Sequence, residues 1–428
     1  MPEQEQRLGR PRIVVALLGA LAVAVTSGSA LVADQAPPPP ASTTITRADV
    51  IACPVLAGTA TLWATAPRDT LTLRTADKAT TVDVPLKLTA PTTVFALLPV
   101  NGQPAGAISA EAGTAVSWGS CAQAQSRQTL VLADSRGTDI LLVNADATDA
   151  VVNVTLRGPD GLVKAGGTRG LKVPSLGSLA VPLSVLTPAG EPVSAEIEAT
   201  VGRVRAFGRL AGTTGIDVAG SAPADTQHTL GAVPAGATGV TLLVSNPGQR
   251  RATLTVTALG GSGRFTPAGA ERVTVAPGVT TKVDLSGAAS ETEPIAVHVT
   301  SDEPVAASLS IAKSADVANL ASQELLENGQ VLVPGGRLVL ANPTDEDATV
   351  TLAADAIAGA GVPEAVQVVK AGHVWSVALP TRAATVTITS VVPLGAWVVL
   401  PSGAATAPLQ AVRETSTAIT LERDPRLR

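Results

Sequence analysis

Hydrophobic and polar residues alternate along most of the chain with a period of two. The run Thr253–Thr257 reads Thr-Leu-Thr-Val-Thr, and similar runs recur between short polar turns. In a strand this period places every second side chain on the same face, so one face of the sheet is apolar and the other polar. Val and Thr dominate the runs, which fits the preference of β-branched residues for strands. The pattern predicts an all-β protein of antiparallel strands.

The alternating runs form a repeat of about one hundred residues. Asn144, Asn246 and Asn342 lie 102 (144 to 246) and 96 (246 to 342) residues apart. Each ends an apolar run and is followed by a polar turn and a new alternating run. Asparagine suits such turns because its side chain hydrogen-bonds nearby backbone and tolerates left-handed geometry. We interpret the three asparagines as equivalent turn residues rather than as ligand-binding groups.

Each repeat holds about six or seven predicted strands, which is typical of an immunoglobulin-like β-sandwich. A propeller is disfavoured because its blades have four strands in about 40–50 residues. A fainter copy at Leu71–Leu86 has Arg74 in place of the asparagine. One segment, Ala315–Gly329, lacks the alternation, and we interpret it as a linker with a helical turn. We expect four sandwiches, at residues 50–125, 126–222, 223–325 and 326–428, the last with a charged tail.

The first residues predict export. Arginines in the segment 1–12 precede an uncharged apolar segment, 13–33. Because arginines ahead of an apolar run stay in the cytoplasm, we expect the rest of the chain to be exported. The apolar segment would span about 31 Å as a helix, enough to cross the hydrocarbon core. The small residues Gly28, Ser29 and Ala30 would alternatively form the cleavage site of a signal peptide.

Two locations therefore stay open. The first is a single-pass protein of the cell membrane with an extracytoplasmic C-terminal region, and the second is a protein secreted after signal cleavage. Residues 34–49 follow the apolar segment and contain four consecutive prolines. Such a run favours an extended polyproline helix, so we expect a semi-rigid linker between the membrane and the sandwiches.

Composition narrows the classes of partner. The chain is 45% hydrophobic and 15% charged with a net charge of −5, which argues against a disordered chain and against a nucleic-acid partner. It has four tryptophans, three phenylalanines and no tyrosine, which is few for a sugar-binding surface. We interpret the tryptophans as large anchors of the sandwich cores, with a glycan-stacking surface as the alternative. They are Trp63, Trp118, Trp375 and Trp397.

The two cysteines predict a disulfide. Cys53 and Cys121 are the only cysteines, and an even count in an exported chain favours a disulfide. They bracket the first predicted sandwich. In the chain-entropy model such a crosslink stabilises the fold by roughly 4 kcal/mol.

Residues for catalysis are scarce. His228, His298 and His373 fall at different places in their repeats, and no phosphate loop, nucleophile elbow, zinc-helix motif or dinucleotide fingerprint occurs in its required context. Acidic turns such as Asp345–Asp347 could attract Ca²⁺, but Gln249–Arg251 fills the same turn in another copy. We interpret these acids as solvated turn charges. We expect no enzyme activity, no cofactor and no metal.

The chain resembles a family of exported envelope proteins of actinobacteria whose shared domain has no assigned function. The resemblance rests on the N-terminal apolar segment, on Cys53-Pro54 at the start of the exported part, and on the blocks that begin Asn246-Pro247 and Asn342-Pro343. The block at Asn144 departs from the pattern, since alanine replaces the proline. The resemblance covers about residues 50–410 and implies an envelope location near glycan assembly. It supplies no catalytic residues.

Three functions fit these observations. The leading hypothesis is a non-catalytic, membrane-tethered scaffold of the bacterial cell envelope. It would contact the membrane through the N-terminal helix and would bind other envelope proteins or glycan. The second is a carbohydrate-binding module that acts on envelope glycan, and the third is an envelope hydrolase or transferase.

Overall fold

A computed structural model describes most of the chain after residue 42. The described ranges are 43–46, 50–56, 60–67, 69–90, 96–98, 103–113, 115–188, 190–212, 215–358, 361–412 and 418–421. The predicted N-terminal helix at 13–33, with its alternative as a signal peptide, lies outside the described residues. Within these ranges, no helix is long and apolar enough to cross a membrane. The described residues are all-β apart from two short 3₁₀ helices, η1 (Leu183–Val185) and η2 (Ser286–Ala288).

The chain divides into two compact units. The smaller comprises residues 1–47 and 417–428, and in it β1 (Thr43–Thr46) pairs antiparallel with β36 (Ala418–Leu421). These two strands fall in segments that we expected to be a linker and a charged tail. The larger unit, residues 48–416, holds all the other strands.

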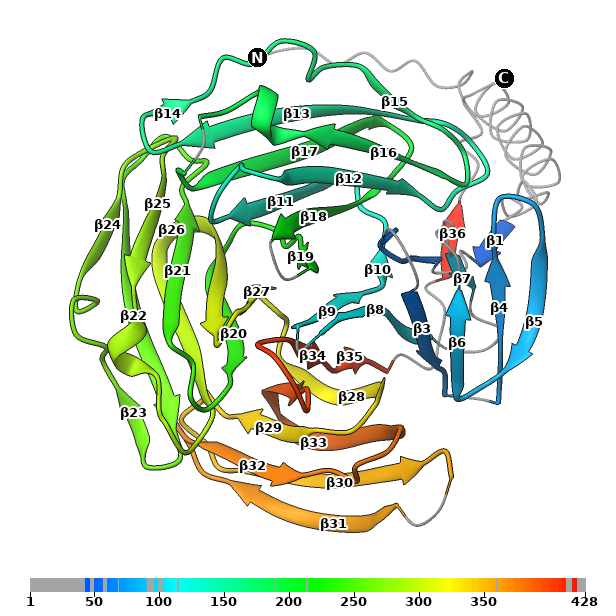
Figure 1. Cartoon of the computed structure of the whole chain (residues 1–428), viewed down its shortest axis with the longest axis vertical. Coiled ribbons are helices and arrows are strands. Elements are labelled where there is room, and N and C mark those ends of the chain that lie inside the picture. Colours follow the sequence, from blue (N-terminus) through cyan, green and yellow to red (C-terminus); the bar gives the residue numbers. More distant parts are fainter. Residues whose placement is uncertain are drawn as a thin grey trace, which may run out of the picture. The chain divides into compact units, whose positions relative to one another are not determined.

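The larger unit contains four β-sandwiches that follow one another along the chain (Figure 1). Sandwich 1 consists of β2 (Ile51–Ala52), β3 (Ala60–Thr65), β4 (Thr70–Arg74), β5 (Ala79–Asp83), β6 (Leu86–Ala90), β7 (Ala96–Leu98), β8 (Ala105–Ala112), β9 (Ala115–Ser120) and β10 (Ala122–Gln123). Sandwich 2 consists of β11 (Arg127–Leu132), β12 (Thr138–Asn144), β13 (Ala150–Gly158), β14 (Gly161–Leu162), β15 (Leu171–Val173), β16 (Gly177–Pro182), β17 (Val193–Val201), β18 (Arg205–Gly212) and β19 (Gly215–Gly220).

The other two sandwiches have the same kind of composition. Sandwich 3 consists of β20 (Asp225–Val233), β21 (Gly239–Ser245), β22 (Ala252–Gly260), β23 (Gly263–Phe265), β24 (Val273–Val275), β25 (Thr280–Asp284), β26 (Ile295–Lys313) and β27 (Asp316–Ala321). Sandwich 4 consists of β28 (Leu326–Val333), β29 (Arg337–Ala341), β30 (Ala348–Ala356), β31 (Val362–Val369), β32 (Val374–Ala378), β33 (Ala384–Val399), β34 (Thr406–Pro408) and β35 (Gln410–Ala411).

All four sandwiches share one strand order. In sandwich 1, one sheet has the order β2-β7-β4-β5 and the other β6-β3-β8-β9, and the corresponding strands of the later sandwiches pair in the same way. In sandwiches 3 and 4 the sixth and seventh strands are a single strand, β26 or β33, which passes from one sheet into the other. Tandem sandwiches are thus observed, but their order is not the immunoglobulin one, in which the first strand neighbours the second. Here the first strand pairs with the sixth in all four sandwiches, whether or not the sixth and seventh are continuous.

The three asparagines occupy the same environment in three sandwiches, as predicted. Each is fully buried at the end of the second strand or just after it. The Nδ2 atom of Asn246 donates to the carbonyl oxygens of Arg250 at 2.7 Å and Val275 at 3.1 Å, and its Oδ1 accepts from the amide of Gly248 at 2.9 Å. Asn144 and Asn342 make the equivalent three bonds. One side chain therefore ties its turn to the end of a later strand in each case, namely β15, β24 or β31.

The segment 315–329 contains strands, so the predicted linker with a helical turn is wrong. Residues Asp316–Ala321 form β27, which pairs with the end of β26. The alternation was hidden because Asp316 and Asn319 are polar yet buried, being 7% and 4% exposed. Their polar atoms bond to other sandwiches, as described below.

The predicted disulfide is present. Cys53 and Cys121 are bonded and lie buried in the core of sandwich 1. Cys53 follows β2, and Cys121 separates β9 from β10. The bond therefore fixes the first strand of this sandwich to its last.

Candidate functional site

One strand near the C-terminal end of each sandwich meets the corresponding strands of the others in the larger unit. Strand β9 lies beside β19, β27 and β34, and β19 also lies beside β27 (Figure 1). We call this region the junction. It comprises these four strands and the residues of the four sandwiches that contact them. It brings together residues up to about 300 positions apart, since Gln410 bonds to Gly106 through both its side-chain atoms. No sequence motif marked this region in advance.

The carboxylate of Asp316 connects three sandwiches at the junction. It lies at the start of β27 in sandwich 3 and accepts a bond from the amide of Ala404 in sandwich 4 at 2.8 Å. A longer contact of 3.5 Å joins it to the amide of Val116 in sandwich 1. Its other oxygen accepts from the amide of Val317 at 3.0 Å. A buried carboxylate is tolerated here because backbone N–H groups satisfy both of its oxygens.

A second carboxylate joins sandwiches 2 and 3. Asp217 on β19 accepts from the amide and the side-chain Nδ2 of Asn319, both at 2.9 Å. Burial raises the pKa of Asp217 to about 6, and the nearby charge of Asp316 acts in the same direction, while the bonds from Asn319 oppose the rise. Asp217 therefore carries a charge that folding disfavours at neutral pH.

Arg205 supplies the positive charge of the junction. It lies on β18, its Nη2 donates to the carbonyl of Ser221 at 2.7 Å, and its guanidinium lies 5.8 Å from the centre of the Phe207 ring. It has no ion-pair partner among the described residues. Burial lowers the pKa of Arg205 to about 10, so it remains protonated at neutral pH. The buried amide of Gln128 holds Ser221, whose hydroxyl donates to Gln128 Oε1 at 2.6 Å.

Three of the four tryptophans lie between sandwiches rather than within them. Trp63 and Trp118 of sandwich 1 join the core of sandwich 4, with ring centres 6.2 Å apart. Trp397 packs in a cluster shared by sandwiches 3 and 4. Gly395 makes room for the Trp397 ring, since a Cβ at Gly395 would lie 2.2 Å from it. The predicted role as core anchors is thus corrected for these three, whereas Trp375 packs against the core of sandwich 4.

A cavity of about 150 Å³ lies at the junction. Its wall includes the rings of Trp118, Phe207 and Trp397, together with Arg205. Several buried polar atoms of wall residues have no hydrogen-bond partner within the described protein. They are Trp118 Nε1, Ser120 Oγ, Arg205 Nε, Asn319 Oδ1 and Thr406 Oγ1. Buried polar atoms are nearly always paired, so their gathering around one cavity makes it the strongest candidate for a binding site.

The three histidines do not come together as a site. His228 is buried, and its Nε2 lies 2.8 Å from the carbonyl of Val305 and 3.0 Å from that of Asp225. His298 Nδ1 lies 3.1 Å from the hydroxyl of Thr229, and His373 Nδ1 lies 2.8 Å from the carbonyl of Ala371. Burial lowers the pKa of both His228 and His298. Each ring is thus held by a strand or turn of the fold.

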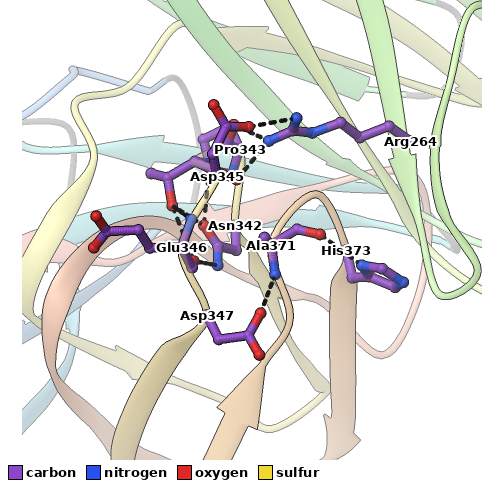
Figure 2. A network of polar contacts seen from close by, with 9 residues as sticks. Arg264, Asn342, Pro343, Asp345, Glu346, Asp347, Ala371 and His373 are labelled. Atoms are coloured by element: carbon purple, nitrogen blue, oxygen red, sulfur yellow. Dashed lines mark hydrogen bonds and ion pairs between the residues drawn. The ribbon is translucent and has the colours of Figure 1, made fainter.

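A second polar network joins sandwiches 3 and 4 at the turn after Asn342. Figure 2 shows the guanidinium of Arg264, from sandwich 3, reaching this turn. Its Nη1 pairs with Asp345 at 2.8 Å, and its Nη2 donates to the carbonyls of Pro343, at 2.8 Å, and Thr344. A Cβ at Gly372 would lie 2.6 Å from the Arg264 side chain, so a glycine is needed there. The network fastens one sandwich to the next.

The acidic residues of these turns are exposed to solvent, as expected, and some also accept hydrogen bonds from backbone amides. Asp347 accepts from the amide of Ala371 at 2.8 Å (Figure 2), and Asp149 accepts from the amide of Ser175 at 2.9 Å in sandwich 2. These acids each cap a neighbouring turn, and Asp149 also pairs with Lys172. Within the ranges given above, no three His, Cys, Asp or Glu side chains are grouped to hold a metal ion.

The sequence was also compared with known proteins. No protein of curated function matches it. A model of a protein family, described as a family of unknown function, matches residues 101–336, from the end of sandwich 1 into sandwich 4. This match covers more than half of the 428-residue chain. The chain therefore belongs to the family of unknown function DUF5719.

Proposed function

We propose that the protein is a non-catalytic scaffold of the bacterial cell envelope, tethered by its N-terminal segment and displayed outside the cytoplasmic membrane. The observation that carries the proposal is the junction, where Asp316 bonds to three sandwiches at once. Such contacts hold the sandwiches in fixed positions, as a platform for partners requires. Other envelope proteins or glycan strands are the proposed partners.

The use of the histidines supports a role without catalysis. A general base needs a ring nitrogen that is free to reach a substrate. The Nε2 atom of His228 faces two backbone carbonyls, so it carries the proton and is occupied. His298 and His373 bond to a threonine hydroxyl and a backbone carbonyl, and the three rings lie in separate contacts. An envelope hydrolase or transferase would have to assemble its base elsewhere.

The carbohydrate-binding alternative is weakened by the positions of the tryptophans. Stacking against a sugar chain needs an exposed ring face. Trp63, Trp118 and Trp397 are 5% exposed or less, and Trp375 is partly buried. Glycan contact would then rely on polar side chains or strand edges.

The experiment compares four variants in a strain that lacks the protein. Single substitutions of His228, His298 and His373 by asparagine should restore envelope integrity as well as the wild type does. A variant whose segment 13–33 is replaced by a cleavable signal peptide should be exported and folded, yet should fail to restore it. Crosslinking in intact cells should capture a recurrent envelope partner with the wild type and the histidine variants, but not with the released variant. A histidine variant that folds, is exported and fails would overturn the scaffold proposal in favour of an enzyme.

A further inference from the structure

We propose that the junction cavity binds a small oxyanion that also carries a hydroxyl group, such as hydrogen phosphate or a short hydroxycarboxylate. The cavity is lined by residues of all four sandwiches, including Trp118, Arg205, Asn319 and Thr406. This inference does not depend on the scaffold role, because it concerns what the cavity holds rather than what the outer surface contacts.

The charge of the cavity wall favours an anion. Arg205 is the only charged residue of the wall, and it has no carboxylate partner within the described part of the chain. Asp217 and Asp316 lie near the cavity but do not line it, and their oxygens accept bonds from amides and from Asn319. Arg205 is only partly exposed and its Nε atom is buried, so an anion that approaches it would offset the cost of a largely desolvated charge. Arginine also suits phosphate and carboxylate groups geometrically.

The unpaired atoms specify what the anion must offer. Trp118 Nε1 and Arg205 Nε are donors without acceptors, which oxyanion oxygens would supply. Asn319 Oδ1 is an acceptor without a donor, and its orientation is fixed because Nδ2 donates to Asp217. A ligand that carries its own hydroxyl group would donate to it. Trp118, Asn319 and Thr406 are each at least nine-tenths buried, so bulk water does not serve these atoms.

The size of the cavity limits the ligand. Its volume of about 150 Å³ matches that of an engineered protein cavity that binds benzene, a molecule of about six non-hydrogen atoms. Hydrogen phosphate and a three-carbon hydroxycarboxylate are of this size. A sugar chain is far too large, so the site differs from the one expected of a carbohydrate-binding module.

The test measures ligand-dependent stability of the whole protein. Thermal unfolding is followed with sodium phosphate, sodium lactate or sodium chloride at equal ionic strength and pH 7. An excess of about one hundred times the dissociation constant should raise the unfolding midpoint by about 3 °C with phosphate or lactate, relative to chloride. The arm with the larger shift identifies which of the two oxyanions the cavity prefers. Equal midpoints in all three salts would show a cavity filled by water and would overturn the proposal.

Two variants and a control localise the site. Arg205→Gln should weaken binding at least tenfold in calorimetric titration. Thr406→Val removes only an unpaired hydroxyl, so the free protein should be as stable as the wild type while affinity falls several-fold. Arg209→Gln, on the same strand but paired with Asp139 away from the cavity, should leave affinity unchanged. If Arg205→Gln does not fold, the affinity of Thr406→Val still tests whether the ligand binds in the cavity. Unchanged affinity in that variant would place the ligand elsewhere.

Discussion

Replacement of Asn246 tests whether one buried side chain holds each repeat's turn. Asn246 is fully buried, donates to the carbonyls of Arg250 and Val275, and accepts from the amide of Gly248. An alanine leaves two carbonyls without their donor. Because an unpaired buried polar group costs about 1–3 kcal/mol, Asn246→Ala should lower the free energy of unfolding by about 4 kcal/mol.

Aspartate at the same position adds a signature that alanine lacks. An ionised carboxylate cannot donate to the two carbonyls, and it places a negative charge against them. Burial and these carbonyls would raise its pKa above the ordinary value of about 3.9. The folded state would then hold the proton more tightly than the unfolded state, so stability should fall as the pH rises from about 4. At low pH the protonated carboxyl can donate one bond and recover part of the loss.

Urea unfolding followed by tryptophan fluorescence, at several pH values between about 4 and 8, measures both effects. The difference from the wild type should be independent of pH for Asn246→Ala and should grow with pH for Asn246→Asp. The exposed Asn328 provides a matched control, since Asn328→Asp should differ little from the wild type at any pH. Equal stability of Asn246→Asp and the wild type at pH 8 would refute the assigned role of the side chain.

Three further predictions concern the junction and its surroundings. Asp217→Asn keeps the acceptor for Asn319 and removes a buried charge whose pKa is raised to about 6, by burial above all. The free energy of unfolding of the wild type should fall by up to about 3 kcal/mol as the pH rises from about 4 to 6, whereas that of the variant should not. In denaturant titrations above pH 6 the variant should therefore be more stable than the wild type. Burial lowers the pKa of His228, so stability should fall as the pH drops below about 6.5, where the unfolded state takes the proton, and His228→Asn should show a shallower fall. Gly395→Ala would push a methyl group into the Trp397 ring and should cost about 1–3 kcal/mol, whereas Gly287→Ala, with no neighbouring atom within 4 Å, should cost far less by the same assay.

The alternation of residues was sufficient to predict most of the strands, the repeat and the asparagine turns. These features depend on local rules: a strand with one apolar face has a period of two, and an asparagine hydrogen-bonds the backbone of its own turn. The paired cysteines were likewise predictable, because two cysteines in an exported chain allow a single pairing. The bend that joins the sixth and seventh strands was not predicted, because the polar segment 301–303 inside β26 has the same sequence signal as a turn between two strands.

The junction could not be predicted for a different reason. Asp316 and Asn319 interrupt the apolar face of β27 because their partners lie in other sandwiches. In the sequence such residues look like loop residues, and so this strand was misassigned. The tryptophans posed the same difficulty, because a buried ring between two sandwiches has the same sequence signal as a ring inside one. Polar residues at positions where the repeat expects apolar ones were the only available clue.

The contacts between the sandwiches have a consequence for how such a protein can change in length. Sandwich 1 packs on sandwich 2 through a shared hydrophobic cluster, and hydrogen-bonded hydroxyl groups join sandwich 2 to sandwich 3. Arg264 joins sandwich 3 to sandwich 4 through an ion pair. Gln410 of sandwich 4 then hydrogen-bonds to Gly106 of sandwich 1. In an open solenoid each repeat touches only its neighbours, so copies can be added or lost one at a time. Here the loss of sandwich 3 would leave Asp217 without its hydrogen bonds from Asn319. It would also leave two backbone amides without Asp316 as their acceptor. Because each sandwich contacts the next and the fourth contacts the first, the number of copies is fixed. Duplication of one repeat would therefore disrupt these contacts instead of lengthening the protein.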